Sequence, residues 1–256
     1  MTAIGYQVSS LKDYLTTPES VFCTFRRLKE IGYRYVQLQW IHPDVPMESV
    51  KEALDETGLV CIATQDGFQE VRKDLDRFIA MNRIWNSSTL CISTVPKDMM
   101  TEDGIEFFCT EMKRIAMLLK EKGIGLTFHP LWYNFDLVNG IRAIDKIMED
   151  LPDEIGLTLC IYHAVKAGAD PVSVLERYMG RIHICHFKDY TVFPDGSEHL
   201  VPVGQGKIDW PIVFNACIET GVMYGLSEQE SHLKDPFLCA KESLDYILST
   251  EKCFTR

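Results

Sequence analysis

The sequence predicts an α/β protein, a (β/α)8 TIM barrel that forms a single domain over residues 1–256. The length of 256 residues suits one barrel of this kind. Short apolar runs alternate with amphipathic helical patterns from end to end, which is typical of strand–helix units with a parallel sheet. Eight such runs favour a closed barrel over an open sheet. The sequence shows no linker and no low-complexity segment that would indicate a second domain.

The expected strands and helices can be placed in order along the chain. The strands are expected at residues 3–8, 35–39, 60–65, 89–93, 125–129, 156–161, 181–187 and 223–228. Two intervening helices are predicted by apolar residues at helical spacing, which are Phe108, Met112, Ile115 and Leu119 in one and Ile141, Ile144 and Ile147 in the other. Asp170 followed by Pro171 predicts a capped helix start, and Gly180 predicts the end of that helix. The last helix is expected over residues 235–248.

The composition excludes several classes of partner. The formal net charge is −11 with no basic run to offset it, so a phosphate backbone would be repelled and we expect no nucleic acid partner. No apolar run reaches the length of a membrane span and no secretory signal is visible, so we expect no membrane partner. The nine cysteines lack paired spacing, and Cys61, Cys91, Cys160 and Cys185 lie in apolar runs. Free buried thiols in a reducing compartment explain this best, which predicts a cytoplasmic protein.

Polar side chains follow two of the expected strands at their carboxyl ends. The run at residues 181–189 ends in His186, Lys188 and Asp189, and the run at residues 221–230 contains Glu228. In a barrel enzyme the carboxyl ends of the strands meet at the mouth, where the active site lies. The two strands together therefore predict a site, although His186 and Glu228 could instead only bond each other or loop amides. Glu230 is expected at the rim rather than in the site.

The alternation of side chains along each strand extends this prediction to four more strands. In a barrel, alternate residues face the axis. The residues expected to face it are Tyr35, Gln37, Gln39, Cys61, Ala63, Gln65, Gly125, Thr127, His129, Thr158 and Cys160. His129 and Cys160 should therefore lie at the same end as His186 and Glu228. Gln37 and Gln65 could contact a ligand or could form a bonded polar layer that only stabilises the barrel.

Several motifs, in this order and at this spacing, resemble one known superfamily. They lie at residues 32–38, 54–59, 167–171, 186–189 and 204–210. Together they make the chain similar, over nearly its whole length, to the xylose-isomerase-like superfamily of sugar isomerases and epimerases, including its inosose dehydratase-like and tagatose epimerase-like members. The resemblance implies an enzyme that acts on a small sugar or cyclitol. A homodimer is compatible with it.

The resemblance also implies one divalent cation at the barrel mouth. Typical ligands are a glutamate or histidine on strand five, an aspartate on strand six, a histidine on strand seven and a glutamate on strand eight. His129, His186 and Glu228 match three of these positions, but Cys160 stands where the family has aspartate. Two imidazoles, one carboxylate and a thiolate would suit zinc better than magnesium or manganese. With only three good ligands, the site could also bind metal weakly or not at all.

Other positions depart from the family pattern. Relatives of the inosose-processing type often carry a His-Asn-His stretch followed by a glutamate, whereas this chain has Leu131 and Asn134 there. The loop before residue 210 usually reads Gly-Glu-Gly, and here Gln205 replaces the acid. The family's activity could therefore be altered or lost in this chain.

The predicted function is metal-assisted isomerisation, epimerisation or a related lyase reaction that begins with proton abstraction next to a carbonyl. Glu228 is the candidate base or metal bridge, and His129 is the opposing acid/base group or ligand. The candidate substrate-binding residues are Lys188, His163, Trp132, Gln37 and Gln65. Each of three of these residues could instead have no role in binding. Lys188 could be a solvated lysine at the strand end, His163 could be an exposed loop histidine, and Trp132 could simply cover the barrel core.

Two other functions are alternatives to an enzyme of this kind. The first is a non-catalytic or altered sugar-binding barrel that has lost part of the metal site, which the change at Cys160 favours. The second is an endonuclease of the related abasic-site type. That activity needs several zinc ions and a basic face for DNA, and the sequence shows neither.

Overall fold

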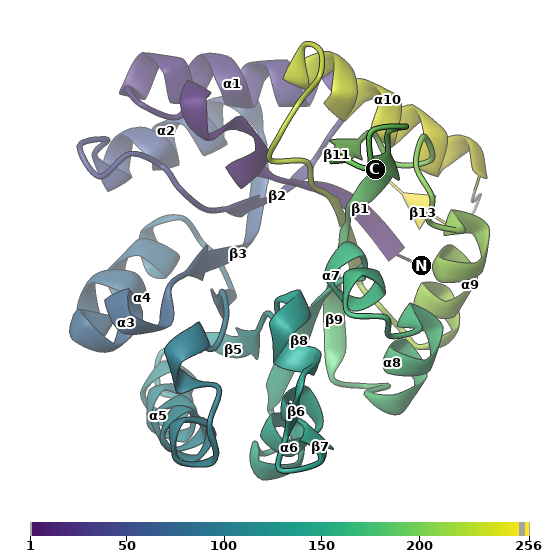
Figure 1. Cartoon of the computed structure of the whole chain (residues 1–256). Coiled ribbons are helices and arrows are strands. Elements are labelled where there is room, and N and C mark those ends of the chain that lie inside the picture. The colour runs from purple at the N-terminus through teal and green to yellow at the C-terminus, as the bar shows by residue number, and fades with distance from the viewer. Residues whose placement is uncertain (1, 251–253, 256) are drawn as a thin grey trace.

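A closed parallel barrel forms the centre of the molecule in the computed structural model, which describes residues 2–250, 254 and 255. The strands follow one another in the order β12-β9-β8-β5-β4-β3-β2-β1, and pairing of β12 with β1 closes the ring (Figure 1). Their bounds are β1 (Thr2–Gln7), β2 (Tyr35–Leu38), β3 (Val60–Asp66), β4 (Thr89–Ile92), β5 (Gly125–Phe128), β8 (Ile155–Cys160), β9 (Ile182–Phe187) and β12 (Tyr224–Ser227). The predicted fold class is confirmed, and every expected strand is present to within a few residues.

Helices surround the barrel on its outer side (Figure 1). Those of α type are α1 (Pro18–Ile31), α2 (Met47–Thr57), α3 (Phe68–Lys73), α4 (Leu75–Ile84), α5 (Glu102–Lys120), α6 (Ala143–Asp150), α7 (Ile161–Lys166), α8 (Pro171–Arg177), α9 (Trp210–Glu219) and α10 (Pro236–Thr250). Short 3-10 helices are η1 (Val8–Tyr14), η2 (Lys97–Met99) and η3 (Trp132–Phe135). Between them and the sheet lies the main apolar core. The apolar stripe of α5 is fully buried in it, as its spacing predicted.

The prediction that Ile141 lies on a helix is wrong. Ile144 and Ile147 are buried on α6, but Ile141 is exposed and lies in β7 (Ile141–Arg142), which pairs with β6 (Leu137–Val138). Asn139 and Gly140 form the turn between these strands with positive φ angles of 51° and 81°. An Asn-Gly pair favours this type of hairpin turn, so the dipeptide was a usable signal.

The barrel interior has an apolar floor and a polar upper layer. A small buried cluster plugs the floor and consists of Ile62, Ala63, Ile184 and Leu226, with Tyr35 and Tyr224 packed against it. Cys61, expected to face the axis, instead belongs to the outer core between sheet and helices. The pairing of β2 with β3 skips one residue, so Val36 pairs with Cys61 while Gln37 pairs with Ala63. This bulge changes the alternation of side chains, which sequence spacing alone does not reveal.

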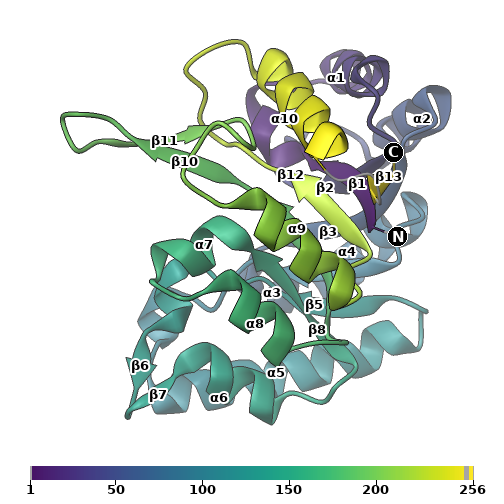
Figure 2. The same ribbon diagram turned by 90° about the vertical axis from the view of Figure 1, so that its right-hand side faces the viewer.

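A hairpin extends from the end of β9 and leads into the loop before α9. It consists of β10 (Asp189–Val192) and β11 (Glu198–Val201), and it projects away from the body of the barrel (Figure 2). A short strand, β13 (Phe254–Thr255), pairs in parallel with the first residues of β1, Thr2 and Ala3. In the described part of the chain, no helix is long and apolar enough to cross a membrane.

Candidate functional site

A cavity of about 560 Å³ opens at the carboxyl ends of the strands. Its wall includes several of the predicted site residues, namely Gln65, His129, His163, Lys188 and Glu228. Gln37, Cys160 and His186 have no exposed surface and lie beside these groups inside the barrel. The structure therefore brings most of the predicted side chains together. Trp132 is not among the lining residues; it lies on η3 and is partly exposed.

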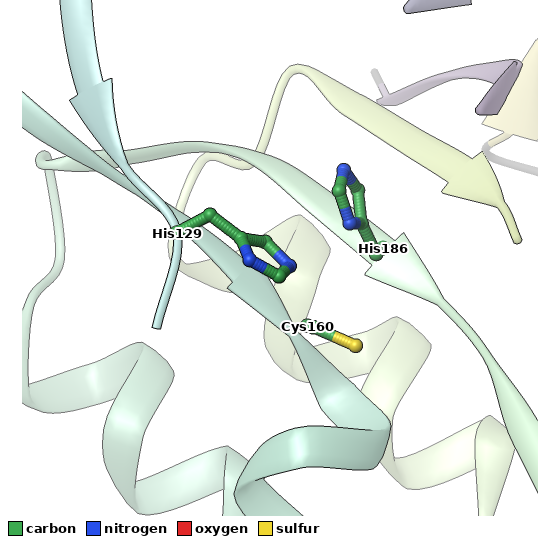
Figure 3. Close-up of side chains that lie close together, drawn as sticks. All are labelled: His129, Cys160 and His186. Atoms are coloured by element: carbon green, nitrogen blue, oxygen red, sulfur yellow. The ribbon is translucent and has the colours of Figure 1, made fainter. Parts of the chain in front are cut away.

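Two buried imidazoles face each other at the base of this cavity (Figure 3). The rings of His129 and His186 lie 4.8 Å apart between centroids. His129 Nδ1 lies 2.9 Å from the carbonyl oxygen of Ser93, and His186 Nε2 lies 2.6 Å from Oε1 of Gln37. These oxygens only accept, so the outer nitrogen of each ring carries the proton. The other two nitrogens, His129 Nε2 and His186 Nδ1, have no hydrogen-bond partner among the described residues, and each can offer a lone pair to a ligand when its ring is neutral.

Cys160 completes this group of ligand atoms, and Glu228 lies beside it. One nitrogen of each histidine and the Sγ of Cys160 lie within 4.8 Å of one another. Glu228 Oε2 lies 3.4 Å from His186 Nδ1 and 3.9 Å from Cys160 Sγ. Two lone pairs and a carboxylate at one point repel each other unless a proton or a metal ion lies between them. The donor set of two nitrogens, one carboxylate and a thiol is one that zinc accepts.

Burial controls the protonation of this group. Burial lowers the pKa of His129 to about 3, with the neighbouring His186 acting in the same direction, so His129 is neutral near pH 7 and can act as a ligand. Burial also raises the pKa of the Cys160 thiol far above its ordinary value, although Lys188 opposes this. Cys160 is therefore a neutral thiol in the protein without metal, and only a bound ion would make it a thiolate.

A buried lysine provides the positive charge of the site. Lys188 Nζ lies 3.4 Å from Glu228 Oε2 and 2.6 Å from Glu230 Oε1. Burial alone would lower the pKa of Lys188, but the two carboxylates more than offset it and raise the pKa. Burial alone would raise the pKa of Glu228, but Lys188, with His186 and His129 acting in the same direction, outweighs it, and the pKa falls well below the ordinary range. Lys188 is thus a buried ion-pair partner, and the alternative of a solvated lysine is wrong.

The glutamines form a continuous layer across the barrel. Gln7 Nε2 donates to Oε1 of both Gln37 and Gln39, and Gln37 Nε2 donates to Gln65 Oε1. Gln65 Nε2 donates in turn to Gln39 Oε1, at 3.2 Å. The side chain of Gln37 is buried, and its amide groups bond to this layer and to His186, which fits the polar-layer interpretation. Gln65 and Gln39 also reach the cavity wall, so they can serve both roles.

His163 lies in helix α7 rather than in an exposed loop, so that alternative is wrong. Its ring centroid is 5.8 Å from that of His129, and its Nδ1 is buried without a partner among the described residues. Burial and the charge of Lys188 lower its pKa, which keeps the imidazole neutral. A neutral imidazole on the cavity wall can bond a ligand hydroxyl as donor or acceptor.

A family model described as xylose isomerase-like TIM barrel matches residues 25–247 of this chain. The chain belongs to this family. Among relatives, the inosose dehydratase of Lacticaseibacillus casei is 27% identical over 176 residues, which are 60% of this chain and 57% of that protein. The chain thus spans little more than half the length of this relative. The relatives are named for the modification of sugars and cyclitols.

Solved structures of the same fold are similar along almost the whole chain. The sugar phosphate isomerase/epimerase from Parabacteroides distasonis ATCC 8503 has a TM-score of 0.80 at 19% identity, covering 96% of this chain and 93% of that chain. An L-ribulose 3-epimerase has a TM-score of 0.79 at 18% identity, covering 98% of this chain and 94% of that chain. At such low identity these likenesses show the fold.

The departures from the xylose isomerase-like pattern have structural explanations. Asn134 is fully buried, and its Oδ1 accepts hydrogen bonds of 2.8 Å from Leu131 N and Thr94 Oγ1. It therefore holds the loop after β5 and adds no charge to the mouth. Gln205 Nε2 donates to Glu242 on α10 at 2.6 Å, and so the glutamine is engaged with that helix.

Three functional candidates were not identified from the sequence. Glu230, expected at the rim, lines the cavity and bonds Lys188. Asp66, at the end of β3, lines the same cavity, and burial raises its pKa to about 7 although Arg77 opposes this. Trp40 also lines the cavity. Asp66 follows Gln65 at a strand end, which was a usable signal, whereas the position of Trp40 depends on loop conformation.

Proposed function

We propose that this protein is a metal-assisted isomerase or epimerase, or a related lyase, that acts on a small keto-sugar or cyclitol. The supporting observation is the pair of buried imidazoles with unpartnered nitrogens beside Glu228, where one nitrogen of each ring and Cys160 Sγ lie within 4.8 Å of one another. The family membership favours sugar chemistry, and the relatives named inosose dehydratase and L-ribulose 3-epimerase favour keto-sugars or cyclitols as substrates.

The residues present fit a divalent ion. His129 Nε2, His186 Nδ1 and Glu228 would hold it, with Cys160 as a fourth ligand. Gln37 and Ser93 fix the two rings by their outer N–H groups, which is how proteins usually orient metal-binding histidines. A bound ion would polarise the substrate carbonyl and stabilise the negative charge that develops on its oxygen. The nitrogen-rich set favours zinc, while manganese and magnesium prefer more oxygen ligands.

The protein's own groups would move the proton and hold the substrate. Glu228 is kept ionised by Lys188, so its carboxylate can accept the proton from the carbon next to the carbonyl. Lys188 would bind a substrate oxygen, and this contact would weaken its hold on Glu228 and increase the basicity of that carboxylate. His129 is the opposing acid/base candidate, and His163 and Gln65 would bind hydroxyl groups from the cavity wall.

A second candidate is a sugar-binding barrel without catalysis. The observation that favours it is the replacement of acidic ligands by neutral groups, because Cys160 is a protonated thiol and Asn134 is tied into a loop. Lys188 also already neutralises Glu228 without a metal. In this case the barrel would bind a sugar at the mouth without exchanging its protons.

Metal binding and proton exchange test the proposal together. Purified protein should bind zinc or manganese in calorimetric titration, and should exchange the proton next to the carbonyl with solvent deuterium for a member of a panel of ketoses and inososes. Glu228→Gln keeps the shape but removes the charge, and should slow exchange by about 10²–10⁴. Binding of a panel sugar without any exchange in metal-saturated protein would favour the second candidate. An unchanged exchange rate in Glu228→Gln would remove Glu228 from the mechanism.

A further inference from the structure

A second cavity adjoins the one at the barrel mouth. It has a volume of about 660 Å³, within the range of small-molecule sites. Gln39, Trp40, Asp66 and Glu70 line both cavities, so the two share a boundary. A molecule bound at the mouth can therefore extend directly into the second cavity. We call the second cavity the side pocket.

The apolar walls of the side pocket are firmly held. They come from the loop between β2 and α2 and from helix α4. Phe78, Met81 and Trp85 are almost fully buried and present their surfaces to the pocket. Trp85 is fixed in addition by a hydrogen bond of 2.9 Å from its Nε1 to the carbonyl oxygen of Met47. Rigid aromatic walls of this kind suit a flat apolar ligand group.

Trp40 stands at the boundary between the two cavities in a strained conformation. Its φ angle is 58°, in the left-handed region that is rare and unfavourable for a bulky residue. The strain is not offset by burial, because the residue is 52% exposed. Lys12 Nζ lies 5.5 Å from the centroid of its ring. An exposed indole held under strain next to two cavities is better suited to binding than to packing.

We propose that the side pocket binds an aromatic aglycone of a glycoside substrate, which stacks on Trp40 while the sugar ring occupies the barrel mouth. The substrate class is thus an aryl glycoside whose sugar ring carries a keto group, because the proposed proton abstraction needs a carbonyl and an ordinary glycoside has none. The sugar half of this inference rests on the proposed function, whereas the aglycone half rests on the side pocket alone.

The charges at the pocket favour a neutral aglycone. Glu48, Asp66 and Glu70 line it, and Arg77 is the one arginine or lysine among its described lining residues. A phosphate or carboxylate substituent would meet more negative than positive charge there. Asp66 and Glu70 lie at the shared boundary, where the glycosidic oxygen and the nearest hydroxyls would pass. With a pKa of about 7, the Asp66 carboxyl can donate as well as accept a hydrogen bond near neutral pH.

The affinities of matched phenyl and methyl glycosides test this assignment. The probes are phenyl and methyl glycosides of a set of hexoses, at up to 10 mM, with binding measured by calorimetry on metal-free and on zinc-loaded protein. At least one phenyl glycoside should bind about tenfold or more tighter than its methyl counterpart, because the phenyl group leaves water for an apolar pocket. Trp40→Ala should abolish that advantage, and Trp40→Phe should retain most of it.

A control variant and a separate readout make the outcome decisive. Phe193→Ala removes an exposed aromatic side chain on the β10–β11 hairpin and should leave the phenyl preference intact. Absence of a phenyl preference in the wild type, absence of all phenyl glycoside binding, or a preference that survives Trp40→Ala would overturn the proposal. Proton exchange on free sugars tests the proposed function independently. A phenyl preference without proton exchange would support the aglycone site in the side pocket and contradict the proposed enzyme activity. Proton exchange without a phenyl preference would support the enzyme activity and contradict the aglycone site.

Discussion

Each buried histidine at the mouth is oriented by one acceptor on its outer side, and this detail decides what the site can bind. Ser93 and Gln37 each engage one ring nitrogen, so the other nitrogens, His129 Nε2 and His186 Nδ1, are the ones left to bind a ligand. The side-chain alternation of the strands predicted that His129, His186 and Glu228 would meet at one end. It could not predict which nitrogen faces inward, because that depends on partners from other strands.

Cys160 is the residue whose substitution should change metal preference most. Cys160→Asp places a carboxylate near Glu228 Oε2, which lies 3.9 Å from the present sulfur. In metal-free protein the two like charges should repel and lower the free energy of unfolding. The added hard oxygen should raise manganese affinity by at least about tenfold. Calorimetric titration with zinc, manganese and magnesium measures the affinities, and urea denaturation measures the stability.

A neutral variant of similar size separates charge from shape at this position. Cys160→Ser should bind manganese no better than the wild type and should not show the repulsion. If Cys160 is a thiolate ligand in the zinc-bound protein, both variants should lose or only hold zinc affinity. Unchanged affinity for every ion in Cys160→Asp would show that residue 160 does not reach the metal.

At the scale of elements, the Gly-Gln-Gly loop is explained by one buried carboxylate. Asp189 Oδ2 accepts hydrogen bonds from Gly204 N at 3.0 Å, Gly206 N at 3.0 Å and Trp210 Nε1 at 2.8 Å. A Cβ on Gly206 would overlap the Asp189 carboxylate, so glycine is required there. Asp189, which the sequence placed beside Lys188 at a strand end, therefore anchors the loop before α9 and does not face the cavity.

Asp189→Asn should destabilise the protein while it leaves the helices formed. An amide presents an NH2 group to donors that need an acceptor, so at least one charge-assisted hydrogen bond is lost inside the protein. The expected loss is about 2–4 kcal/mol in the free energy of unfolding. Urea denaturation followed by circular dichroism measures it. Asp195→Asn on the exposed β10–β11 turn is the control, and an equal loss in both variants would contradict the anchoring role.

The strands and most helices were predictable because their apolar periodicity lies within single segments. The departures from that periodicity were not predictable. The bulge that moves Cys61 to the outer core depends on the pairing of β2 with β3. Ile141 lies in the exposed hairpin, but it precedes Ile144 and Ile147 of the next helix at the same three-residue spacing. Neither feature follows from periodicity in a single segment, because each is set by a turn or by a neighbouring strand.

At the scale of the whole molecule, ring closure explains why eight short strands produce a stable site. β1 pairs with both β2 and β12, so the two ends of the chain close the same sheet. The site residues come from strands far apart in the sequence, and closure brings them together. The count of strand–helix units in the sequence already favoured a closed barrel, but the two cavities at its mouth depend on the loops and could not be predicted from it.

The pH dependence of stability should reveal the half-buried carboxyl of Asp66. Its pKa is raised from 3.8 to about 7, so between these pH values the folded protein binds more protons at this group than the unfolded chain. The stability contributed by this group is therefore fully present below about pH 4 and is lost as the pH rises toward 7. Asp66→Asn stays neutral and should lack this loss. From pH 5 to pH 8, the variant should gain on the order of 1–3 kcal/mol over the wild type in the free energy of unfolding.

Urea denaturation at both pH values measures the difference, with Asp98→Asn as an exposed control. A parallel pH profile for the wild type and Asp66→Asn would show that Asp66 titrates as an ordinary exposed aspartate.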